Sequence, residues 1–122
     1  MRCFILVTLL LLYSSSVHAA GLPKSILDKV PGMNSAQLYA LQTVRIGNAI
    51  EMEAEHRSIR VREHHRDPLY ACIKNMLRAA FSPEDIRTML LEPPGIDYAY
   101  YDKRITIVMN NISKKCLPIL DR

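Results

Sequence analysis

The segment His56–Arg66 gathers the residues of this sequence that are best suited to binding chemistry. Its four arginines are Arg57, Arg60, Arg62 and Arg66. Guanidinium groups pair well with sulfate, phosphate and carboxylate groups. We therefore take these arginines as a candidate docking surface for a protein receptor, a sulfated polysaccharide or another anionic surface. The alternative is a solvated helix face that nearby glutamates neutralise. These glutamates are Glu51, Glu53, Glu55 and Glu63.

The three histidines of the same segment raise the question of a metal site. They are His56, His64 and His65. His56 and His64 can share one flank of a helix, but a zinc site needs three or four ligands at a recognisable spacing, which this segment does not supply. We therefore expect exposed histidines with a mild pH sensitivity, and we expect no metal and no other cofactor.

Motifs for catalysis and for nucleic-acid binding are missing from the sequence. It contains no G-x-S-x-G nucleophile elbow, no H-E-x-x-H zinc motif and no glycine-rich phosphate loop. After His18, all histidines lie within His56–Arg66, which makes a histidine-based active site improbable. The formal net charge of +4 is only mildly basic, and aromatic residues do not interleave with the arginines. We therefore expect a protein that is not an enzyme and binds no nucleic acid.

The N-terminus has the parts of a secretory signal peptide. Arg2 supplies a positive charge, an apolar run of about ten residues ends at Tyr13, and Val17-His18-Ala19 is a suitable peptidase site. This run has about half the length that a membrane-spanning helix needs. We expect a signal peptide at 1–19 and a single secreted, extracellular domain at 20–122 without stable membrane insertion. A retained N-terminal anchor is the alternative.

Cys72 and Cys116 are the cysteines that remain once the signal peptide is removed. A pair of cysteines in a secreted domain usually forms one disulfide, and both residues fall on predicted inward faces of helices. Closing a loop of about 44 residues stabilises a fold by about 4 kcal/mol in the chain-entropy model. We predict this disulfide within one chain. A dimer linked through one or both cysteines is the alternative, so the oligomeric state stays open.

The second half of the chain carries strong helix signals. Asp67-Pro68 predicts a helix start, because aspartate caps free N–H groups and proline suits the first helical position. Ser82-Pro83 repeats this signal, with Asp85 in the position of a capping box. Pro93-Pro94-Gly95 then predicts a stiff turn. The apolar spacing predicts a last helix from about Tyr98 that ends near a proline close to the C-terminus.

The first half of the chain is harder to interpret. Asn34 or Ser35 is a suitable cap, and the residues from Ala36 to about Arg66 have high helix propensity. Apolar residues occupy more than one face, so we expect a helix that is buried centrally or bent near Gly47. Residues 59–62 alternate like a strand but are too few to decide. Together the patterns predict an all-α fold, a small bundle of four or five helices with one disulfide.

Methionines on the predicted inward faces suggest a second function. They are Met76, Met89 and Met109, and the tyrosines near the last helix are Tyr98, Tyr100 and Tyr101. Methionine adapts to flexible apolar guests, so a helical domain lined by these residues is suited to a lipid or an odorant-like ligand. Ordinary core packing is the simpler explanation of the same pattern.

Two kinds of covalent modification have sequence signals. Asn111-Ile112-Ser113 is an N-x-[ST] sequon, and Asn111 falls away from the apolar face of its predicted helix, so Asn111 is a candidate glycosylation site. Arg57-Ser58-Ile59-Arg60 and Lys114-Lys115 have the basic residues at which hormone precursors are cut. Both fall inside predicted helices, which disfavours a hormone precursor.

The function that fits these features is a secreted, non-catalytic binding or signalling factor that acts through contacts with a protein or an anionic surface. The alternative is an extracellular carrier of a small apolar ligand. A carrier should copurify with lipid, and a binding factor should not.

Overall fold

A computed structural model describes residues 22–121 of the chain. In this range the chain forms five α-helices, two short 3-10 helices and no strand. The α-helices are α2 (Lys24–Leu27), α3 (Ser35–His56), α4 (Glu63–Ala80), α5 (Pro83–Leu91) and α6 (Tyr98–Lys115), and the 3-10 helices are η1 (Val30–Gly32) and η2 (Leu117–Asp121). The predicted small all-α bundle is confirmed. The signal peptide predicted at 1–19 lies outside the described residues.

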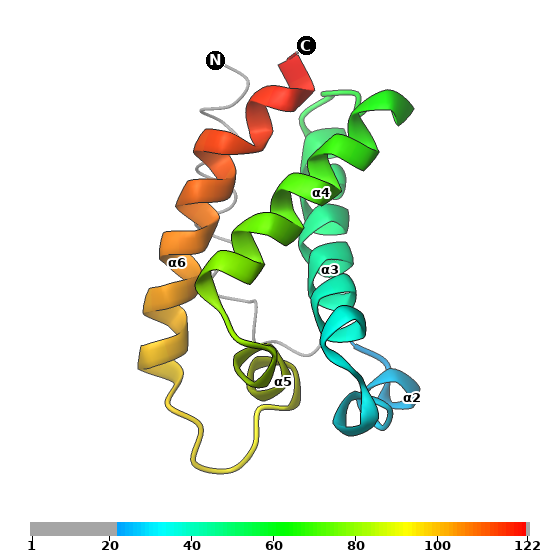
Figure 1. Cartoon of the computed structure of the whole chain (residues 1–122). Coiled ribbons are helices and arrows are strands. Elements are labelled where there is room, and N and C mark those ends of the chain that lie inside the picture. The colour runs from blue at the N-terminus through cyan, green and yellow to red at the C-terminus, as the bar shows by residue number, and fades with distance from the viewer. Residues whose placement is uncertain (1–21, 122) are drawn as a thin grey trace.

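Helix α4 is the central element of the bundle, because it packs against α3, α6 and η2 (Figure 1). Helix α5 packs against α3 and η1, and η2 packs against both α4 and α6. The connection between α3 and α4 lies at the same end of the molecule as the C-terminus, whereas α2 and α5 lie at the opposite end. The bundle therefore brings the arginine-rich segment and the C-terminal residues to one end.

Buried apolar side chains at three- and four-residue spacing give each long helix one inward face. In α4 these residues include Leu69, Ile73 and Leu77, and in α6 they include Ile105, Val108, Met109 and Ile112. The chain does not leave the core after α6. It continues as η2, whose Leu117, Ile119 and Leu120 are also buried.

Capping boxes with reciprocal hydrogen bonds begin both α3 and α5. The sequence predicts the box at Ser82, whereas at α3 it predicts only a cap at Asn34 or Ser35. The Asn34 side chain accepts from the Gln37 N–H, and the Gln37 side chain accepts from the Asn34 N–H, each at 2.9 Å. The Ser82 hydroxyl accepts from the Asp85 N–H at 3.1 Å, and the Asp85 carboxylate accepts from the Ser82 N–H at 3.0 Å. These bonds satisfy N–H groups that a helix start leaves without an internal partner. Beyond α5 the chain turns at Gly95, whose φ of 84° favours glycine.

The predicted boundary between α3 and α4 is wrong. Helix α3 ends at His56 rather than near Arg66, and α4 begins at Glu63 rather than at the Asp67-Pro68 pair. Proline therefore lies inside α4, just beyond its first turn, where its missing N–H removes one hydrogen bond of the helix. Residues 57–62, which we call the α3–α4 link, are neither helix nor strand.

Helix α3 ends in a Schellman cap that the sequence does not predict. The Ile59 N–H donates to the Ala54 carbonyl at 2.7 Å, and the Ser58 N–H donates to the Glu55 carbonyl at 2.9 Å. These are the two hydrogen bonds of this motif. Ser58 has the left-handed φ of 57° that the motif requires, and Ile59 packs inward with 8% of its surface exposed. Glycine usually occupies the position of Ser58, so the usual signal for a helix end is missing.

Helix α3 buries one face rather than its whole circumference. Of the two alternatives predicted for it, central burial or a bend near Gly47, central burial is therefore wrong. Val44 is 43% exposed and Met52 is 61% exposed, so part of its apolar surface faces solvent. The buried positions, which include Leu38, Ile46 and Ile50, follow helical spacing along one side. Among residues 22–121 no helix, α3 included, is both long and apolar enough to cross a membrane.

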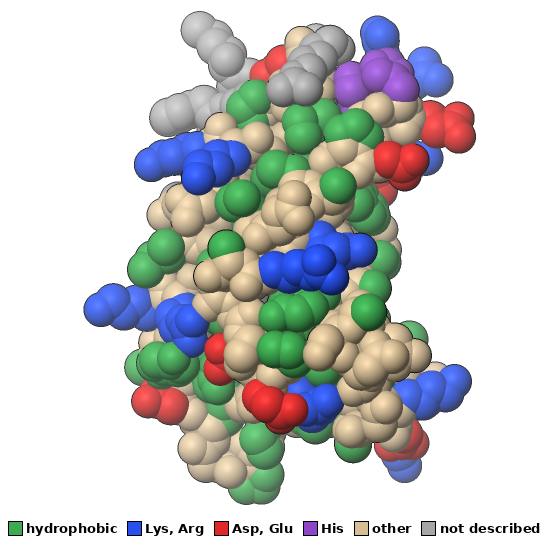
Figure 2. All heavy atoms as spheres, viewed as in Figure 1, with side chains coloured by type: hydrophobic (Ala, Val, Ile, Leu, Met, Phe, Trp, Pro, Cys, Tyr) green, Lys and Arg blue, Asp and Glu red, His purple; other side chains and the backbone are tan. Residues whose placement is uncertain are grey.

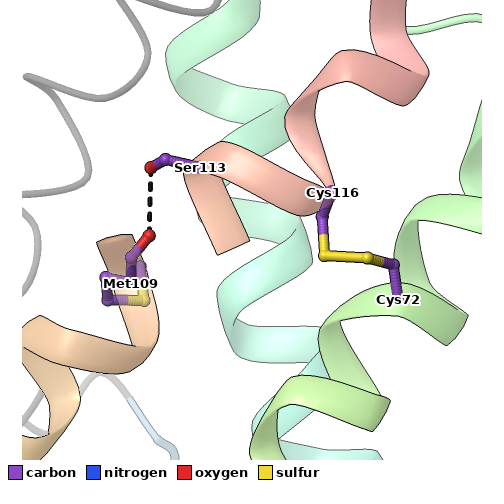
Figure 3. The surroundings of a disulfide bond; sticks show 4 residues. All are labelled: Cys72, Met109, Ser113 and Cys116. Carbon is purple, nitrogen blue, oxygen red and sulfur yellow. Dashed lines mark hydrogen bonds between the residues drawn. A yellow bond between two sulfur atoms is a disulfide. The ribbon is translucent and has the colours of Figure 1, made fainter. Parts of the chain in front are cut away.

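Cys72 and Cys116 lie at disulfide distance, with their Cα atoms 5.6 Å apart (Figure 3). Cys72 is in the middle of α4, and Cys116 is the residue that caps the end of α6. The bond joins the central helix to the end of the last helix and encloses α5. The two cysteines that the sequence pairs are therefore brought together by the fold.

Candidate functional site

A groove of about 880 Å³ lies where the end of α3, the α3–α4 link and the start of α4 meet. Helix α3 contributes Asn48, Glu51, Met52 and Glu55, the link contributes Arg60, Val61 and Arg62, and α4 contributes Glu63 and Arg66. We call it the arginine groove. Figure 2 shows basic, acidic and histidine side chains close together at this end of the molecule. The Schellman cap makes the groove possible, because it turns the chain away from the axis of α3 before α4 begins.

Glu51 is the centre of a polar network on the wall of the groove. One of its carboxylate oxygens accepts from Arg66 Nε at 2.5 Å. Its other oxygen lies 2.9 Å from the Tyr70 hydroxyl, which is also 3.0 Å from the Asn48 side-chain oxygen. The hydroxyl has one proton and can donate it to either acceptor. The network ties the first half of α4 to the second half of α3.

Tyr70 is held in its protonated form by this environment. Burial of the ring raises the pKa of Tyr70 to about 12, and the hydrogen bond to Glu51 and the negative charge of Glu51 add to the effect. The same carboxylate raises the pKa of Arg66, mainly through its hydrogen bond. Both pKa shifts keep the Tyr70 hydroxyl and the Arg66 guanidinium protonated, and these are the donor forms that the network needs.

Gly47 permits the close approach of α3 and α4 beside the groove. A β-carbon at this position would lie 2.5 Å from Cζ of Tyr70, well inside van der Waals contact. Glycine is therefore required by packing here and not by backbone conformation. The absence of a side chain lets the Tyr70 ring lie across α3 and reach Asn48 and Glu51.

The four arginines of the candidate docking surface do not act as one group. Arg60, Arg62 and Arg66 line the groove, whereas Arg57 is exposed outside it. Arg66 is paired with Glu51, but within residues 22–121 neither Arg60 nor Arg62 forms an ion pair. The groove also contains three glutamates, so its lining carries both signs of charge. They are Glu51, Glu55 and Glu63.

The histidines of this segment occupy different environments. His56 and His64 are exposed, but His65 is buried, with 4% of its surface accessible, which contradicts the expectation that all three are exposed. The rings of His64 and His65 lie 4.0 Å apart between centroids. Over the described range 22–121, no three His, Cys, Asp or Glu side chains are grouped so that they could hold a metal ion.

The methionines and tyrosines proposed for an apolar ligand do not line the arginine groove. Met89 and Met109 are buried in the main core, and Met76 packs against it. Tyr98 and Tyr100 are each 47% exposed near the start of α6. The methionine positions therefore match the simpler explanation, core packing.

In the sequon near the end of α6, Asn111 is exposed, whereas Ile112 and Ser113 are buried. Asn111 is exposed, as expected from its place opposite the apolar face. Ser113 is buried, and its hydroxyl donates to the Met109 carbonyl at 3.0 Å (Figure 3). An enzyme that must read the serine hydroxyl has no access to it once α6 has packed. A glycan on Asn111 therefore requires attachment before the helix folds.

Two residues of the site, Asn48 and Tyr70, were missed at the sequence level, and Gly47 was named there only as the place of a bend. The only sequence signal for Tyr70 is its spacing from Arg66. The two residues are four positions apart and so share one face of α4. That spacing does not identify Glu51 as their common partner. The packing of α4 against α3 decides it.

Comparison with known proteins finds no match to this chain among family models, curated proteins or solved structures.

Proposed function

We propose that this chain is a secreted, non-catalytic binding factor that engages a protein partner through the arginine groove. The observation that carries the proposal is the presence of two exposed arginines, Arg60 and Arg62, beside the largely exposed Met52. Neither arginine forms an ion pair within residues 22–121. Protein interfaces are enriched in arginine and methionine relative to the rest of the surface, and methionine adapts to irregular partners.

The charge pattern of the groove favours a protein over a sulfated polysaccharide. A polysaccharide of this kind is negative along its whole length, and Glu55 and Glu63 would repel it next to the arginines. A protein surface can place carboxylates against Arg60 and Arg62 and a basic side chain against the glutamates. Complementary charges of both signs give such contacts specificity as well as attraction.

Secretion is supported by the N-terminal pattern and is compatible with the cysteine pair. Arg2, the apolar run and Val17-His18-Ala19 are typical of a signal peptide, and a disulfide is stable in oxidising compartments. The released protein is expected to begin at Ala20 or within about two residues of it. Mass spectrometry of the medium of expressing cells checks this, and a released chain that retains Met1 would contradict it.

A carrier of a small apolar ligand gains no support from the groove. The groove lining is charged or polar at seven of nine positions, with Met52 and Val61 as its apolar members. The methionines suggested for ligand contact belong to the core or pack against it.

The binding proposal is tested with labelled, secreted protein on intact cells. The double variant Arg60→Gln/Arg62→Gln is expected to weaken saturable binding about tenfold, a loss of about 1.4 kcal/mol. The control Lys114→Gln/Lys115→Gln removes the same charge from exposed positions at the end of α6 and should bind like the wild type.

Pretreatment of the cells separates the two partner classes. Protease treatment should abolish binding, and enzymatic removal of sulfated polysaccharides should leave it unchanged. Loss of binding after polysaccharide removal alone would assign the arginines to an anionic surface. Equal binding of the two double variants would show that the groove arginines do not contribute to partner binding.

A further inference from the structure

In the α3–α4 link, residues 57–59 donate the hydrogen bonds that cap α3, whereas residues 60–62 leave their backbone N–H groups unused by the described part of the fold. The N–H groups of Arg60, Val61 and Arg62 donate no backbone hydrogen bond within residues 22–121. Arg57, Ser58 and Arg60 are exposed. A partner that adds to an extended segment gains affinity from such unpaired backbone groups. Endoproteases hold their substrates in an extended form, which Ser58 does not have in the folded chain because its φ is 57° in the cap of α3.

The side chains of the link match a recognised kind of cleavage sequence. In Arg57-Ser58-Ile59-Arg60 one arginine precedes the Arg60–Val61 bond, and another stands three residues earlier. The helix that was expected to protect this bond ends at His56. Lys114-Lys115, by contrast, lies in the last turn of α6, where helical hydrogen bonds hold the backbone and Cys116 follows in the disulfide. Of the two basic sites, the first thus lies outside a helix and needs only a local opening to admit a protease.

We propose that the α3–α4 link is a processing site, at which an Arg-x-x-Arg-specific endoprotease of the secretory pathway hydrolyses the Arg60–Val61 bond. Water is the second reactant: its oxygen joins the carbonyl carbon of Arg60, and its protons go to the products. The bond breaks to give a carboxyl group on Arg60 and an amine on Val61. The inference rests on the proposed secretion of the chain.

Cleavage at this bond changes the arginine groove and leaves the bundle without a covalent connection across the cut. Cys72 and Cys116 both belong to the C-terminal product, so the disulfide does not hold α3. Packing against α4 and α5 must retain it. Arg60 and Val61 line the groove, and the new carboxylate and amine therefore appear inside it. Processing in this way alters the charges that a partner meets.

The buried side chain of Ile59 sets the expected rate of cleavage. A protease needs several consecutive residues in extended form, so Ile59, which is 8% exposed, must leave the core. That opening is local, because it breaks the two hydrogen bonds of the cap and leaves the bond from the His65 N–H to the Arg62 carbonyl at the start of α4 in place. The folded chain should be cut more slowly than an unfolded one, but without unfolding of the bundle.

The test is the mass of the protein released by cells that contain such proteases. The wild type should give two chains under reducing conditions, 20–60 and 61–122. Arg60→Gln and Arg57→Gln should each give one undivided chain, and the control Lys115→Gln should still be cut after Arg60. A released wild-type chain of undivided mass overturns the proposal.

A second measurement is independent of secretion. Purified, folded wild-type chain is incubated with a subtilisin-like protease specific for Arg-x-x-Arg, and the products are followed by mass. Cleavage after Arg60 before any cut at Lys114-Lys115 is expected. An uncut link, or a first cut in α6, overturns the processing site, whereas retention of the chain in cells with Met1 intact contradicts only the proposed secretion.

Discussion

Helix α4 is fastened to its two neighbours by different chemistry. On one side, the disulfide between Cys72 and Cys116 joins it covalently to the end of α6. On the other side, Tyr70 and Arg66 reach the carboxylate of Glu51 on α3 through partly exposed polar contacts. The covalent side resists solvent and pH, and the polar side responds to both. The arginine groove and the α3–α4 link lie on the polar side, where local opening requires less free energy.

Removing the disulfide should have the largest effect on stability. The double variant Cys72→Ala/Cys116→Ala is expected to lower the free energy of unfolding by about 4 kcal/mol, because the open loop gains conformational freedom in the unfolded chain. Urea denaturation measures this loss, and chemical reduction of the wild type should reproduce it. A non-reducing gel that shows covalent dimer in place of monomer would contradict the pairing within one chain.

Filling the gap at Gly47 should weaken the polar side next. In Gly47→Ala the new methyl group forces the Tyr70 ring away, and the strain of about 1–3 kcal/mol exceeds the gain of up to about 1 kcal/mol in helix propensity. We expect a net loss of about 1 kcal/mol in urea denaturation. Gly32→Ala is the control, because no atom lies within 4 Å of its added carbon. Similar losses of stability in Gly47→Ala and Gly32→Ala would contradict the close approach of the Tyr70 ring to Gly47.

Tyr70→Phe should remove an alkaline pH dependence with a smaller effect at neutral pH. The pKa of Tyr70 is raised to about 12, so its stabilisation is complete below the ordinary tyrosine pKa of about 10 and is lost as pH rises toward 12. Urea denaturation should therefore show wild-type stability falling more steeply than that of the variant between these pH values. At pH 7 the lost hydrogen bond should account for about 1 kcal/mol or less. Parallel pH profiles would contradict the network.

Removing the two groove arginines without ion-pair partners should have the smallest effect on stability. Arg60→Gln/Arg62→Gln is expected to change the free energy of unfolding by less than about 0.5 kcal/mol, because both side chains are exposed and neither forms an ion pair in the described part of the chain. Thermal denaturation checks this. A larger loss would show that the arginines support the fold rather than a partner.

Local physics in the sequence was sufficient for several features of the fold. The capping box at Ser82 and the cap at Asn34 depend on residues within four positions of each other, so the residue types alone predict them. The turn at Gly95 follows from consecutive prolines and a glycine. The pairing of Cys72 with Cys116 follows from the removal of Cys3 with the predicted signal peptide, which leaves two cysteines.

Tertiary structure decided the end of α3 and the contents of the groove. Helix propensity continues past His56, but burial of Ile59 offsets the cost of a left-handed serine at position 58, and no local rule weighs those two energies. Glu51, Arg66 and Tyr70 meet because α4 packs across α3 at Gly47. Contacts between residues far apart in the chain depend on this packing, which a one-dimensional pattern does not contain.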